Sequence, residues 1–106
     1  MWAFLVNSGM KISLVQPNFR QGGSAFSGYW LPYSVGCVYS YSAQSPEFKD
    51  KLELNKVIFR REKIEWASDD MLDDDIVLFS CYMWNWEYNK ALAKLLKEKS
   101  PDVKIV

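Results

Sequence analysis

Histidine is absent from this 106-residue sequence. Its absence excludes Ser-His-Asp and Cys-His nucleophilic catalysis, and it removes the side chain that most often binds transition metals. It also removes the usual proton-transfer group at physiological pH. Any chemistry must therefore come from other residue types or from a bound cofactor.

Cysteine is almost as scarce. Cys37 and Cys81 are the only two, and their wide separation matches no zinc-binding pattern. We expect both to be small buried hydrophobic residues of a reduced, cytoplasmic protein.

The sequence also lacks a net charge and a long apolar run. Thirteen basic and thirteen acidic side chains cancel, so no general attraction to nucleic acid or an anionic membrane is expected. No apolar stretch reaches the roughly 18 residues of a transmembrane helix. The length suits one domain. Because residues 1–9 carry neither a basic segment nor a signal cleavage site, we expect them to be an extension or a cloning remnant, with the domain spanning 10–106.

Apolar segments with the lengths of strands alternate with amphipathic ones. This alternation predicts an α/β fold of the flavodoxin-like, doubly wound kind, with a parallel sheet in strand order 2-1-3-4 and helices on both faces. The expected strands are residues 11–15, 56–59, 76–80 and 103–106, and the expected helices are residues 32–45, 61–70 and 85–99.

The side-chain pattern adds detail to two of these helices. In the first, Leu31, Val35, Val38 and Tyr39 form one apolar stripe, and Gly36 is expected to let the helix approach the sheet closely. In the last, the apolar stripe consists of Trp84, Tyr88, Ala91, Leu92, Leu95 and Leu96.

A sheet of this order normally has a fifth strand and a closing helix, which these residues do not supply. One sheet edge is therefore expected to be exposed. We expect the rest of a longer protein, or another subunit, to cover it, and we favour the longer protein.

The segment Asp75–Trp86 is the strongest candidate for a site. It begins as a buried strand, ends as an aromatic loop and is followed at once by a helix, for which Asn85 is the expected N-cap. Ligands of open α/β sheets bind at such carboxyl ends of strands. The loop of residues 18–30, after the first strand, is polar, rich in glycine and long enough to be functional.

Four segments together resemble the amino-terminal cobalamin-binding domain of cobalamin-dependent radical S-adenosylmethionine enzymes. The resemblance covers residues 10 to 106, and Ser-Cys-Tyr-x-Trp-Asn, from Ser80 to Asn85, is its most specific part. The four segments are Lys11-Ile-Ser-Leu-Val-Gln-Pro-Asn18, Leu31-Pro-Tyr-Ser-Val-Gly36, Asp75-Ile-Val-Leu-Phe-Ser-Cys-Tyr-Met-Trp-Asn85 and Leu95-Leu-Lys-Glu-Lys-Ser-Pro-Asp-Val-Lys-Ile-Val106.

The resemblance implies a cobalamin whose corrin ring lies across the carboxyl ends of the strands. Asn18, Ser80 and Asn85 are the expected hydrogen-bonding residues, and Cys81 lies among them. An apolar platform is expected from Tyr82, Trp84, Trp86, Tyr29 and Trp30. The predicted site is therefore Asn18, Ser80, Cys81, Tyr82, Asn85 and Trp86, with no catalytic residue and no metal ligand.

The sequence departs from the wider family at several points. Tyr82 stands where leucine is usual, and no Asp-x-His-x-x-Gly element follows the first strand, so no histidine can be the lower axial ligand of cobalt. The Gly-Gly after the fourth strand and the Cys-x-x-x-Cys-x-x-Cys motif of the iron–sulfur cluster are absent. The resemblance therefore implies that the cluster and S-adenosylmethionine bind in a catalytic part outside these residues.

Structural interpretations compete with each of these assignments. Trp84 and Tyr88 are expected to pack the last helix, and Ser80 to end its strand. The acidic run between Asp69 and Asp75 lacks the calcium-loop spacing and is expected to be solvated. Gln21-Gly22-Gly23 does not match a phosphate loop. The alternative function is a cofactor-free, flavodoxin-like interaction or oligomerisation domain.

Overall fold

The computed structural model describes residues 9–18, 20–21, 28–29 and 31–106. The elements are β1 (Met10–Val15), β2 (Arg20–Gln21), β3 (Gly28–Tyr29), α2 (Tyr33–Gln44), β4 (Leu52–Ile58), α3 (Ile64–Asp70), β5 (Ile76–Phe79), α4 (Trp86–Lys99) and β6 (Lys104–Ile105). Of the expected extension, residues 1–8 lie outside the described part, as does Trp30 of the expected platform.

The main sheet has four parallel strands in the order β4-β1-β5-β6. In chain order these are strands 2-1-3-4, so the flavodoxin-like α/β prediction is confirmed. The central strand β1 pairs with β4 on one side and β5 on the other, and Val15 lies opposite Phe79 at the end of the second pair. β2 and β3 form a separate short antiparallel pair within the segment that was expected to be an irregular loop.

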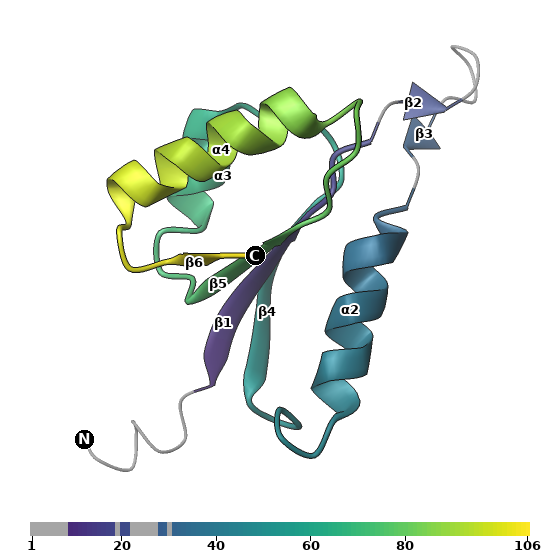
Figure 1. Ribbon diagram of the computed structural model, residues 1–106, viewed down its shortest axis with the longest axis vertical. Helices are drawn as coiled ribbons and strands as arrows, with labels where there is room; N and C mark the ends of the chain where they lie inside the picture. Colours follow the sequence, from purple (N-terminus) through teal and green to yellow (C-terminus); the bar gives the residue numbers. More distant parts are fainter. Residues whose placement is uncertain (1–8, 19, 22–27, 30) are drawn as a thin grey trace.

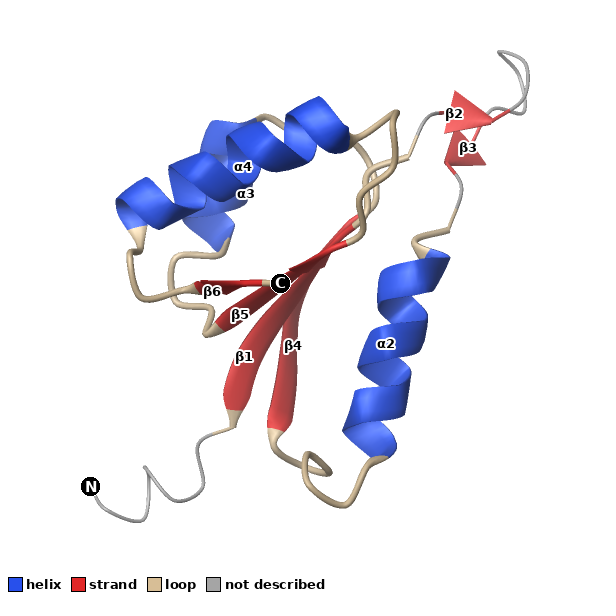
Figure 2. Cartoon of the chain, in the orientation of Figure 1, coloured by secondary structure: helices blue, strands red, loops and turns tan. Residues whose placement is uncertain are grey.

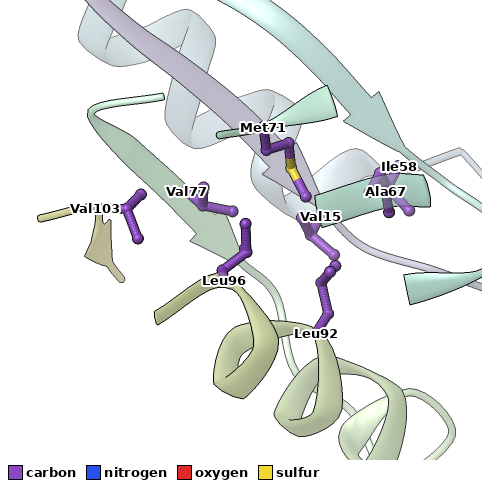
Figure 3. Packing of buried hydrophobic residues seen from close by; sticks show 8 residues of the cluster. All are labelled: Val15, Ile58, Ala67, Met71, Val77, Leu92, Leu96 and Val103. Atoms are coloured by element: carbon purple, nitrogen blue, oxygen red, sulfur yellow. The ribbon is translucent and has the colours of Figure 1, made fainter. Parts of the chain in front are cut away.

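Helices cover both faces of the sheet. Figure 1 shows α2 on one face and α3 and α4 on the other. The larger core lies beneath α3 and α4, where Leu92 and Leu96 of α4 point toward Val15 and Val77 of the sheet (Figure 3). Burying each such side chain stabilises the fold by about 1.5–3 kcal/mol.

The face beneath α2 has a smaller core. Only Val35 of the expected stripe is buried, against Ile12 and Leu14 of β1. Leu31 precedes the helix and is exposed, as is Val38. The close approach expected at Gly36 is wrong, because a Cβ at that position would meet no atom beyond its own helix within 4 Å.

Several expected boundaries were wrong. β4 begins at Leu52 rather than Lys56, and α3 begins at Ile64 rather than Arg61. The β1–β4 ladder pairs Ile12 with Leu54 and then Ser13 with Lys56, which leaves Asn55 as an extra residue in β4. Such a bulge re-aims the side chain that it carries.

The Asn55 side chain contacts an acidic turn that was wrongly expected to be wholly solvated. Its Nδ2 donates to Asp74 Oδ1 and to the Asp70 carbonyl, both at 2.9 Å, and Ser13 Oγ donates to Asp74 Oδ2. Asp74 is buried. Its burial raises the pKa of the carboxyl above the ordinary value, while the hydrogen bonds from Ser13 and Asn55 oppose that rise.

Three further expectations about burial were wrong. Cys37 and Cys81 are both exposed rather than buried. Ala91 of the expected α4 stripe is exposed, and Asn89 is buried on that face instead.

None of the described helices is both long and apolar enough to cross a membrane.

Candidate functional site

Two loops meet at the carboxyl edge of the sheet, where the chain leaves β1 and β5. Because these strands are neighbours and parallel, the segments after them begin side by side, as Figure 2 shows. The Ser80 amide donates to the Val15 carbonyl at 3.0 Å and extends the pairing beyond both strands. Residues 16–18 and 80–85 therefore build one surface, at the position where ligands of open α/β sheets bind.

Asn85 joins the two loops from below. Its Nδ2 donates to the Pro17 carbonyl at 3.1 Å and to the Ser80 carbonyl at 3.0 Å, and its Oδ1 accepts a hydrogen bond from the Tyr82 amide at 2.7 Å. Asn85 occupies the N-cap position of α4, as predicted, but its side chain makes no capping hydrogen bond to the helix. With 0% of its surface exposed, Asn85 supports the rim from beneath.

Tyr82 and Trp84 form an aromatic stack above this support. Their ring centroids are 4.5 Å apart and their planes differ by 4°. Trp84 Nε1 donates to Asn18 Oδ1 at 3.1 Å, and the Trp84 carbonyl accepts a hydrogen bond from Arg61. Trp84 lies before α4 and is 38% exposed, so the expectation that it belongs to the helical stripe was wrong.

The Tyr82 hydroxyl connects the stack to the opposite face of the sheet. It lies 2.7 Å from Ser34 Oγ, in the first turn of α2. Hydrogen bonding by Ser34, and secondly by Ser80, lowers the pKa of the Tyr82 phenol. The stack is thus held at both ends, through Ser34 at one and Asn18 at the other.

Tyr88 has the structural role that was predicted for it. It packs against the larger core, and its hydroxyl donates to the Glu62 carbonyl at 2.6 Å. Burial, reinforced by the Glu62 carboxylate, raises the pKa of Tyr88 to about 12.

Asn89, one turn of α4 after Asn85, belongs to this site although it was not predicted. Its Nδ2 donates to the Ser80 carbonyl at 3.1 Å and lies 3.3 Å from both Cys81 Sγ and Asn85 Oδ1. Asparagine within a helix is unfavourable without such partners. Its placement four residues after Asn85, on one face of the helix, was the signal that could have revealed it.

Apolar side chains and hollows surround this edge. Leu31, Met83 and Trp86 are exposed, Met83 to 91%. One hollow of about 360 Å³ is lined by Cys81, Tyr82, Met83, Trp86 and Glu87. A second, of about 250 Å³, is lined by Phe79, Cys81, Trp86, Asn89, Lys90, Ala93, Ile105 and Val106. A third, of about 180 Å³, lies between α2 and β5 and is lined by Ser34, Val35, Val38, Leu78, Phe79, Ser80 and Val106.

The predicted site residues therefore lie at one edge of the sheet but differ in how deeply they are buried. Cys81 and Trp86 are exposed, Ser80 and Tyr82 are half-buried, and Asn18 and Asn85 are buried. Only the backbone of Tyr29 is described. Within the described ranges, no group of three or more histidine, cysteine, aspartate or glutamate side chains is placed to hold a metal ion.

Comparison with known proteins identifies two distant relatives, while no family model matches the chain. The cobalamin-dependent radical SAM methyltransferase TokK of Streptomyces tokunonensis is 27% identical over 77 residues, covering 73% of this chain and 11% of that protein. A 2-(S-pantetheinyl)-carbapenam-3-carboxylate methyltransferase of Streptantibioticus cattleyicolor is 26% identical over 77 residues, with the same coverage. The chain thus spans about a tenth of the length of the curated relatives that it matches.

Proposed function

We propose that this chain is a cobalamin-binding module, the amino-terminal part of a larger radical S-adenosylmethionine enzyme of the methyltransferase type. The observation that carries the proposal is the joining of two strand-end loops into one aromatic surface by Asn18, Trp84 and Asn85. The similarity to TokK, a cobalamin-dependent radical SAM methyltransferase by name, supports the same conclusion.

The residues at this edge fit a large, flat and amphipathic ligand. The stacked rings of Tyr82 and Trp84 supply an apolar wall, and the exposed side chains of Met83 and Trp86 extend it. Ligand sites of this kind combine such apolar walls with a few placed polar groups. Ser80 supplies one, while Asn18 and Asn85 hold the loops in position.

The residue types of this chain indicate which steps it can support and which it must leave to cobalamin and to the rest of the enzyme. When bound, cobalamin supplies the methyl-transfer chemistry, and the protein positions it. The sequence has no histidine, so no imidazole of these residues coordinates cobalt from below. It has only two cysteines, too few for the three that hold a radical S-adenosylmethionine cluster, so cluster and S-adenosylmethionine belong to another part of the enzyme.

The partner of the β6 edge, in this proposal, is the remaining part of that enzyme. The hollow between α2 and β5 adjoins Val106, which is exposed, and it is lined mainly by apolar side chains. The same observation favours the second candidate function, a cofactor-free interaction domain that pairs with another subunit. An edge strand with apolar flanks is a common route to such pairing.

Gel filtration of the 106-residue chain with hydroxocobalamin distinguishes the two functions. The cobalamin-binding module is expected to carry the corrin absorbance into the protein peak, at a protein concentration where the chain elutes as a single species. Dimerisation that depends on concentration, with no corrin in the protein peak, would support the interaction domain and contradict the proposal.

A further inference from the structure

The Asn89 side chain leaves one hydrogen-bonding atom without a partner. Its Nδ2 is engaged with three acceptors, but its Oδ1 is buried and has no partner within the described part of the chain. Only 2% of the Asn89 surface is exposed. Leaving a buried acceptor unpaired costs about 1–3 kcal/mol, so such atoms are rare and require an explanation.

The hydrogen bonds of Asn89 also establish the orientation of its amide. If the amide were turned over, Oδ1 would face the Ser80 carbonyl and Asn85 Oδ1, two acceptors that cannot donate to it. The atom left over is therefore an acceptor, and the missing partner must be an N–H or O–H donor.

Asn89 lines the hollow of about 250 Å³ between α4 and the end of β6. Most of the lining is apolar, from residues that include Phe79, Trp86 and Ile105. The hollow shares Cys81 and Trp86 with the larger hollow beside Tyr82, so it adjoins the proposed cobalamin surface. The hollow therefore extends that surface, and the buried polar residue in its lining is Asn89.

Lys90 supplies a hydrogen-bond donor, its ammonium group, at the same hollow. Its Nζ lies 5.4 Å from the Trp86 ring centroid and pairs with Glu87 at 3.2 Å, on the exposed side of α4. The hollow therefore offers an acceptor in Asn89 and a donor in Lys90, within apolar walls. A primary carboxamide has both an N–H donor and a carbonyl acceptor, and it carries no charge that would have to be buried.

We propose that this hollow binds a primary carboxamide arm of the ligand, with an amide N–H donating to Asn89 Oδ1. The inference rests on the proposed function, because a corrin ring carries several such arms at its periphery. Asn89 would then select the ligand by its donor group, since a site built for a donor discriminates strongly against analogues that lack it.

The test removes the donor from the ligand rather than from the protein. Hydroxocobalamin is compared by calorimetry with derivatives in which a single carboxamide is replaced by a methyl ester, which keeps the carbonyl oxygen but has no N–H. One of these esters is expected to bind about tenfold more weakly than hydroxocobalamin, while the others bind equally. Equal binding of all the esters would overturn the inference and leave the proposed function intact.

A pair of substitutions tests the hollow itself. Replacing Asn89 would also remove one of the two hydrogen bonds to the Ser80 carbonyl, so the hollow is filled from Ala93, which lines it. Ala93→Leu is expected to weaken hydroxocobalamin binding about tenfold and to abolish the difference among the esters. The matched control is Ala91→Leu, on the exposed side of the same helix, which is expected to bind as the unaltered chain does.

The outcomes separate the two proposals. If Ala93→Leu binds hydroxocobalamin as well as Ala91→Leu does, the carboxamide inference fails alone. The same holds if only an ordered water occupies the hollow, because water would make all the esters equivalent. If the unaltered chain binds no hydroxocobalamin, the proposed function fails and the inference fails with it.

Discussion

Trp84 and Asn18, 66 positions apart in the sequence, are joined by a hydrogen bond from the indole Nε1 to Asn18 Oδ1 at 3.1 Å. This contact ties the loop after β5 to the loop after β1. The Tyr82 hydroxyl makes a second tie to Ser34 of α2, and Asn85 makes a third to Pro17. Because three contacts hold the same short loop, two to the loop after β1 and one to α2, its aromatic surface exists before any ligand binds, which lowers the entropic cost of binding.

Asn85→Ala is expected to destabilise the fold strongly. The substitution leaves the Pro17 carbonyl and the Tyr82 amide without the partner that Asn85 supplies, and the Ser80 carbonyl keeps only its hydrogen bond from Asn89. We expect the free energy of unfolding to fall by about 2–4 kcal/mol, measured by urea denaturation. The control Gln44→Ala, at the exposed end of α2, should change it by less than about 0.5 kcal/mol. A loss as small as that of the control would show that Asn85 does not support the rim.

Asp74→Asn is expected to alter the pH dependence of stability. Burial raises the pKa of Asp74 in the folded state above its unfolded value, so the folded protein holds the proton more tightly. The stability that this carboxyl contributes is therefore present below its unfolded pKa and is lost as the pH rises through its folded pKa. Asparagine retains an acceptor for Asn55 and has no proton to lose.

The comparison needs urea denaturation curves of both proteins from about pH 4 to pH 7, above the ordinary pKa of aspartate. The stability of Asp74→Asn should rise relative to that of the unaltered chain as the pH increases. Parallel pH profiles would contradict the account of Asp74. A relative fall with increasing pH would show that the hydrogen bonds from Ser13 and Asn55 outweigh the burial.

Alkaline titration should distinguish Tyr82 from Tyr88. Hydrogen bonding by Ser34 and Ser80 lowers the pKa of Tyr82, whereas burial raises that of Tyr88 to about 12. Followed by tyrosinate absorbance, Tyr82→Phe should remove an early step of the titration, and Tyr88→Phe a late one. Ser34→Ala should move the early step to higher pH. If Tyr82→Phe removes a late step instead, the contact between Ser34 and Tyr82 does not form in solution.

The sheet was predictable because its signals are local and repeated. Apolar segments such as Lys11–Val15 and Ile76–Ser80 alternate with helical ones, and the handedness of parallel crossovers restricts how they can be arranged. The beginning of β4 was missed because Leu52 to Asn55 includes polar, exposed residues of an edge strand. Its pairing with β1, rather than its composition, makes that stretch a strand.

The location of the site was predictable from the sequence, but the burial of its individual residues was not. The strand-to-loop junction at Ser80 identified the edge, but whether an asparagine faces a ligand or the protein depends on contacts distant in sequence. Asn85 is a good cap by residue type, yet the Pro17 carbonyl engages its side chain from 68 positions away. Asp74 was missed for the same reason, because Ser13 contacts it from 61 positions away. Asn89 is different, because its spacing of four residues from Asn85 was a local signal that could have revealed it.

The measurement that tests the central claim most directly compares two exposed tryptophans, each with a lysine ammonium over its ring. Trp86 lines the proposed surface under Lys90, whereas Trp66 lies on α3 under Lys63 and lines none of the three hollows at the carboxyl edge. The dissociation constant of hydroxocobalamin is measured by calorimetry for Trp86→Ala and Trp66→Ala. If cobalamin binds at the carboxyl edge, Trp86→Ala should weaken binding about tenfold and Trp66→Ala should leave it unchanged. Equal dissociation constants for the two variants would contradict the account.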